Sequence, residues 1–64
     1  MNAVKINLES FMSEAFQESG MTFDAFHGSF GIANKRRGNT LYTEIKNGEL
    51  SVSQLVNLLR MFGA

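Results

Sequence analysis

The residues best suited to chemistry are three consecutive basic side chains near the middle of the chain, Lys35, Arg36 and Arg37. They stand within residues 33–39, a stretch without apolar periodicity that predicts a basic loop. Ammonium and guanidinium groups at this density can neutralise backbone phosphates or enter a minor groove of a nucleic acid. The same run would also suit a solvated loop without a partner, so both interpretations stay open at this point.

Other kinds of chemistry have little material in this sequence. Cysteine is absent, which excludes disulfides, thiolate metal sites and a cysteine nucleophile, and the single histidine, His27, cannot form a metal-binding cluster. Asp24 lies three residues before His27, and on a helix this pair would stabilise rather than catalyse. We find no nucleophile-base pair, paired carboxylates or phosphate-binding glycine loop. We therefore expect no enzyme activity, metal, cofactor or small-molecule ligand.

Charge is distributed unevenly along the chain, although it sums to zero. Residues 1–32 carry four acidic side chains and one basic one, whereas residues 33–64 carry five basic and two acidic ones. This asymmetry indicates an electrostatic binding face in the second half. A chain of 64 residues forms one domain near the lower size limit for independent stability, so we expect association with a second copy or a partner.

The hydrophobic content of 44% is too high for a disordered chain, so a folded domain is expected. The sequence has no apolar run of membrane-spanning length, and its N-terminal segment lacks the apolar stretch of a secretory signal. We therefore expect a cytoplasmic protein with no membrane partner.

Apolar residues recur at helical spacing in the first half of the chain and predict two helices. The first begins after the N-cap Asn7 and ends at Gly20. The second begins after the N-cap Thr22 and ends at Gly31. Phe23 has no obvious buried place, unlike the expected buried positions Leu8, Phe11, Met12, Ala15, Phe16, Phe26 and Phe30.

Two further helices are expected after the basic loop. The third has Asn39 as its N-cap, reaches the core through Leu41 and Ile45, and ends at residues 47–48 (Asn-Gly). The last begins with a capping box at residues 51–54 (Ser-Val-Ser-Gln) and has a broad apolar stripe. The predicted fold is therefore all-α, a single small domain of four to five helices over residues 1–64, with residues 1–6 as an arm or short strand.

The order of these signals resembles the lambda-repressor and Cro-like helix-turn-helix class. Residues 20–22 (Gly-Met-Thr) are similar to the Gly-Leu-Thr that leads into helix 2 of that class, and residues 30–32 (Phe-Gly-Ile) to the Leu-Gly-Ile of its turn. Residues 45–48 (Ile-Lys-Asn-Gly) are similar to the Ile-x-Asn-Gly after its recognition helix. Fourteen residues separate Ile32 from Asn47, about five more than in the class, so the basic loop corresponds to an insertion before the recognition helix.

The resemblance implies a sequence-specific DNA-binding regulator whose third helix lies in the major groove. Asparagine can bond adenine, threonine can contact bases, and lysine can donate to guanine. Each residue taken singly would equally suit a structural role, Asn39 as an N-cap and the threonines as solvated groups. The expected DNA-binding residues are Asn34, Lys35, Arg36, Arg37, Asn39, Thr40, Tyr42, Thr43 and Lys46.

The resemblance also implies a homodimer on double-stranded DNA with an operator-like pseudopalindrome, acting as a repressor by operator occupancy. The broad apolar set of the last helix predicts a dimer contact at Val56, Leu59 and Met61, with a more deeply buried helix as the alternative. Compact regulators of this class are frequent in phages and other mobile elements.

A function of a different kind fits the same scaffold. The chain would then be a protein-binding module, such as an antirepressor or inhibitor, that docks through its last helix and does not bind DNA. The zero net charge, Phe23 in place of the glutamine frequent in the class, and the lengthened turn all favour this alternative.

Overall fold

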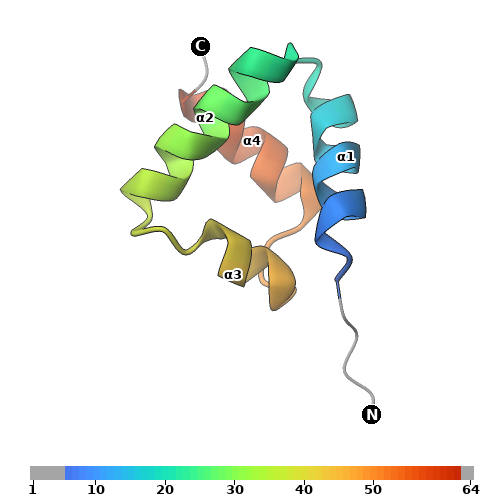
Figure 1. Ribbon diagram of the computed structural model, residues 1–64, viewed down its shortest axis with the longest axis vertical. Helices are drawn as coiled ribbons and strands as arrows, with labels where there is room; N and C mark the ends of the chain where they lie inside the picture. The colour runs from blue at the N-terminus through green and yellow to red at the C-terminus, as the bar shows by residue number, and fades with distance from the viewer. Residues whose placement is uncertain (1–5, 63–64) are drawn as a thin grey trace.

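A computed structural model describes residues 6–62, which form four helices and no strand. The helices are α1 (Leu8–Ser19), α2 (Phe23–Arg36), α3 (Leu41–Lys46) and α4 (Val52–Phe62). The first, second and fourth pack against one another, and the short α3 lies at one end of them (Figure 1). The predicted all-α class is confirmed. The arm or strand expected at residues 1–6 falls outside the described residues except for Ile6, which packs against the core.

Local sequence signals set the starts of three helices as predicted. Asn7 and Thr22 each accept a hydrogen bond from the backbone N–H three residues further on, at 3.0 and 3.2 Å. Before α4, the backbone N–H of Ser51 donates to Gln54 Oε1 at 2.8 Å and that of Gln54 donates to Ser51 Oγ at 3.1 Å. Each such cap stabilises a helix by about 1 kcal/mol, because it satisfies backbone groups that the helix leaves unpaired.

The second helix is longer than predicted. It continues through Gly31 to Arg36, so residues 33–36 are helical and the expected basic loop 33–39 shortens to a connection of residues 37–40. Residues 30–32, which the resemblance assigned to a turn, lie inside α2. A glycine weakens a helix by about 1 kcal/mol but does not by itself end it, and burial of Phe30 and Ala33 secures this segment.

The end of α2 is set instead at Gly38, whose φ of 75° places it in the left-handed region. The N–H of Gly38 donates to the carbonyl of Lys35 at 3.2 Å, and the N–H of Asn39 donates to that of Asn34 at 2.8 Å. This pair of bonds is a Schellman motif, which closes a helix with a left-handed residue. The sequence contained this signal, because basic residues in a last turn followed by glycine are typical of a helix end.

One core joins all four helices. The short α3 reaches it through Leu41 and Ile45, which are fully buried. Phe23 is 65% exposed, in line with its lack of a predicted buried place. The remaining buried apolar residues are Ala15, Phe26, Phe30, Ala33, Leu55, Val56 and Leu59.

Most of the apolar surface of α4 is buried within the single chain. Val56 and Leu59, predicted to form a dimer contact, are buried against α1 and α2. Only Met61 of the three predicted contact residues is exposed, at 73%. The broad apolar stripe thus reflects a more deeply buried helix that packs against two others, which was the alternative to a dimer contact.

Candidate nucleic-acid interface

The third helix presents a polar surface at one end of the domain. Leu41 and Ile45 hold its inner side in the core, so the opposite side faces solvent. Three side chains on that side are exposed and define the outward face of α3: Tyr42, Thr43 and Lys46. They supply a phenol, a hydroxyl and an ammonium group, all of which can donate hydrogen bonds to base edges or phosphates.

Tyr42 is held in place by an aromatic neighbour on α2. Its ring centroid lies 4.9 Å from that of Phe30, with the rings tilted by 47°, and the residue as a whole is 44% exposed. Such a contact restricts the ring while part of the residue stays exposed.

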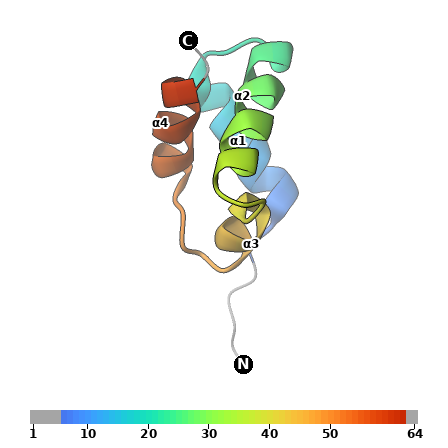
Figure 2. The same ribbon diagram turned by 90° about the vertical axis from the view of Figure 1, so that its left-hand side faces the viewer.

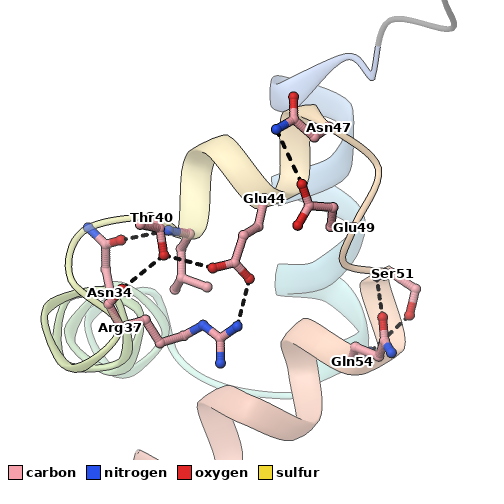
Figure 3. Close-up of polar contacts among 9 residues, drawn as sticks. Asn34, Arg37, Thr40, Glu44, Asn47, Glu49, Ser51 and Gln54 are labelled. Carbon is pink, nitrogen blue, oxygen red and sulfur yellow. Dashed lines mark hydrogen bonds and ion pairs between the residues drawn. The ribbon is translucent and has the colours of Figure 1, made fainter.

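The start of α3 is capped from another helix. Asn34, in the last turn of α2, uses its Oδ1 to accept a hydrogen bond from the backbone N–H of Leu41 at 3.0 Å (Figure 3). Thr40 occupies the N-cap position and makes no side-chain cap bond, whereas Asn39 lies one residue earlier with a φ of 65°. The expectation of Asn39 as N-cap is therefore wrong, and Asn34, expected to contact DNA, has a structural role.

Three side chains form a bonded cluster between α2 and α3, which we call the corner: Arg37, Thr40 and Glu44. Arg37 Nη2 donates to Glu44 Oε1 at 2.7 Å, in the one ion pair within residues 6–62. Thr40 Oγ1 lies 2.7 Å from Glu44 Oε2 and 2.9 Å from the carbonyl of Arg37, and donates its single proton between these two acceptors (Figure 3). The corner ties the connection 37–40 to the first turn of α3.

The corner also favours the ionised form of Glu44. The hydrogen bonds from Arg37 and then from Thr40 lower the pKa of this carboxyl below its usual 4.5, against a smaller opposing effect of desolvation. Glu44 is therefore ionised at neutral pH, and the guanidinium of Arg37 compensates its charge. The arrangement limits the repulsion that an uncovered carboxylate would exert on a phosphate.

The three consecutive basic residues do not form one patch. Arg36 lies over α4, with its guanidinium carbon 5.5 Å from the Phe62 ring centroid, while Arg37 turns to Glu44. Lys35 is exposed and enters no ion pair within residues 6–62, and the same holds for Lys46 on α3. Consecutive helical positions such as Lys35 and Arg36 point about 100° apart, and Arg37 stands one residue after the end of the helix. The cations with open surroundings at this end are Lys35 and Lys46.

The sequence assigned no role to Glu44 and did not indicate the contact between Arg36 and Phe62. Both contacts join residues that belong to different elements, so no helical spacing indicates them. The opposite charges of Arg37 and Glu44 on either side of a short connection were the one signal available.

No protein-family model matches the sequence, and neither a curated protein nor a solved structure shows significant similarity to it. Within residues 6–62, no helix combines the length and apolar character needed to cross a membrane. The structure shows a small all-α domain of four helices over these residues.

Proposed function

We propose that the chain is a sequence-specific DNA-binding regulator of the helix-turn-helix kind, with α3 as its recognition helix. The observation that carries this proposal is the outward face of α3, where Tyr42, Thr43 and Lys46 are exposed on a helix anchored in the core by its other side. A rigidly held helix with donor groups on its exposed side has the properties needed for reading base edges in a major groove.

The charge around α3 supports the same function. Residues 33–49 hold four basic side chains and two acidic ones. Of the two acids, Glu44 is compensated by Arg37, and Glu49 accepts a hydrogen bond from Asn47 Nδ2 at 3.3 Å. In this proposal Lys35 and Lys46 bind backbone phosphates, while the corner keeps Glu44 from opposing them.

The regulator would act as a repressor by occupying its operator, and it would bind as a homodimer on a pseudopalindrome. Val56 and Leu59 do not serve as the dimer contact because they are buried in the single chain. Met61, exposed beside Arg60 at the end of α4, remains the candidate from the predicted set.

The direct test selects DNA with the purified chain. Fragmented DNA from its source is titrated at low and at moderate salt, and the retained fragments are sequenced. We expect an enriched and approximately two-fold symmetric motif. Failure to retain any DNA at low salt would reject the proposal and leave the protein-binding module as the function to pursue.

A double variant, Lys35→Ala with Lys46→Ala, tests which surface binds. We expect weaker binding and a salt dependence of log K reduced by about 0.9 for each phosphate that the variant no longer neutralises. Arg60→Ala is the matched control, since Arg60 is an exposed cation in the last turn of α4 and that end of α4 lies away from α3 (Figure 1), and its slope should equal that of the original chain. An equal drop in affinity in both variants would show that binding does not involve the α3 end specifically.

A further inference from the structure

An apolar hollow lies between α1 and the first turns of α2, far from α3. Phe23 and Phe26 line it from α2, and Met12 and Phe16 line it from α1. The hollow has a volume of about 250 Å³, below the range of about 300 to 1000 Å³ that is usual for small-molecule sites. We call it the groove, and its full lining is Met12, Ser13, Phe16, Phe23, Phe26 and His27.

Aromatic contacts hold the exposed Phe23 in a defined position beside the groove. Its ring centroid lies 4.3 Å from that of His27 and 6.3 Å from that of Phe16, the latter in an edge-to-face arrangement. Phe16 in turn packs edge to face against the buried Phe26 at 5.3 Å. An exposed aromatic ring that its neighbours already position loses little conformational freedom on binding, as in the anchors of protein interfaces.

Within residues 6–32, the two helix segments that line the groove carry only acidic charges. Residues 6–32 contain four acidic side chains and no lysine or arginine. Glu9 and Glu14 line a second shallow hollow on α1, which shares Ser13 with the groove. Two copies of the chain meeting groove to groove would bring these carboxylates together, which disfavours self-association here. A partner with cations beside its apolar residues would be attracted instead.

We propose that the groove is a docking site for an amphipathic helix of a partner protein, which inserts a large apolar side chain beside Phe23 and directs lysine or arginine residues toward Glu9 and Glu14. Helix-in-groove recognition uses this combination of an apolar anchor and flanking charge. The apolar part of the site is separate from the proposed DNA-binding surface. The first turns of α2 and the whole of α3 lie at opposite ends of the domain in both views (Figures 1 and 2), whereas the first turn of α1, which carries Glu9, lies on the α3 side.

The probe is a designed amphipathic peptide of about 18 residues, with leucines on one helical face and lysines on the other. A second peptide keeps the leucines and replaces every lysine by glutamate. Each peptide is titrated into the isotopically labelled full chain, and amide shifts are followed by NMR. We expect the lysine peptide to bind and to shift the amides of groove residues. The glutamate peptide should bind at least about tenfold more weakly.

The variant Phe23→Ser removes the exposed anchor, and Ile32→Ser is its matched control, because Ile32 is 47% exposed on the same helix but outside the groove. We expect Phe23→Ser to weaken the lysine peptide by about tenfold or more and Ile32→Ser to leave it within about twofold. Both side chains are exposed, so both variants should keep the helical spectrum of the original chain. Shifts centred outside the groove, equal binding of the two peptides, or equal affinities of the two variants would overturn the proposal. None of these outcomes depends on DNA binding.

Discussion

The two ends of this domain differ in how their side chains are satisfied. At the α3 end, the polar groups of the corner bond to one another and α3 takes its cap from Asn34 on α2. Beside the groove, by contrast, Phe23 keeps most of its apolar surface in solvent, and the nearby charges on α1 are acidic. The α3 end thus offers donors and cations suited to a polyanion, whereas the groove offers apolar surface and anions suited to a cationic helix.

Removing the cap of α3 is expected to have the largest effect, and it should act on the α3 end alone. Asn34→Ala leaves the N–H of Leu41 without its acceptor at the start of a six-residue helix, and should lower the free energy of unfolding by about 1–2 kcal/mol. Urea denaturation measures this loss. Asn34→Asp, which keeps an acceptor oxygen at the same place, is the control and should retain more of the stability.

The same variant distinguishes the two binding surfaces when the chain is studied under conditions in which it stays folded. Asn34→Ala should weaken binding to the selected DNA, because α3 is less well held, and leave the affinity of the lysine peptide unchanged. Equal weakening of both ligands would mean that the two surfaces are not independent.

Stabilising α2, the helix that runs between the two ends, should have a smaller effect of opposite sign on the free energy of unfolding. Gly31 lies inside α2 with no atom within 4 Å of the position that a Cβ would take. Gly31→Ala should therefore raise the free energy of unfolding by about 0.5–1 kcal/mol through higher helix propensity. Thermal and urea unfolding measure the gain. A loss of stability would contradict a continuous α2 and would favour the turn at residues 30–32 that the sequence resemblance implied.

The smallest expected effect concerns the charge of Glu44. The pKa of its carboxyl is lowered in the folded state, mainly by the hydrogen bond from Arg37, so the carboxylate stabilises the fold above the usual pKa of 4.5. This contribution is lost as the pH falls through the lowered value. Glu44→Gln should therefore lose less stability than the original chain on acidification from neutral pH, as measured by urea midpoints. Identical pH profiles would indicate that the corner adds nothing to stability.

The sequence predicted those parts of the fold that local signals determine. The caps at Asn7 and Thr22 and the capping box before α4 each lie within a few residues of the groups they satisfy, and all three are confirmed. The predicted end of α2 was wrong because Gly31 was taken as the residue that ends the helix. The helix ends later, at a turn with basic residues that is followed by Gly38. The sequence left open whether the apolar residues of the last helix form a dimer contact or are buried, because their burial depends on both α1 and α2, which no single helical stripe reveals.

The sequence predicted which residues belong to the candidate site better than it predicted where their side chains lie. Thr43 and Lys46 were among the expected DNA-binding residues, and burial of Leu41 and Ile45 leaves both on the exposed side of α3. The different directions of Lys35, Arg36 and Arg37 could not be predicted while these residues were assigned to a loop. The helical placement of Lys35 and Arg36, with Arg37 just after the helix end, separates them. The cap from Asn34 joins residues seven apart across a turn, a spacing for which no sequence rule exists.

The central claim is that α3 reads DNA, and mapping a bound duplex onto the chain tests it most directly. The labelled protein is titrated at low salt with the duplex recovered by selection, and amide shifts are recorded by NMR. We expect the largest shifts at Tyr42, Thr43 and Lys46, and no change in those of Phe23 and His27. Binding that shifts the groove and leaves α3 unchanged, or no binding at low salt, would contradict it.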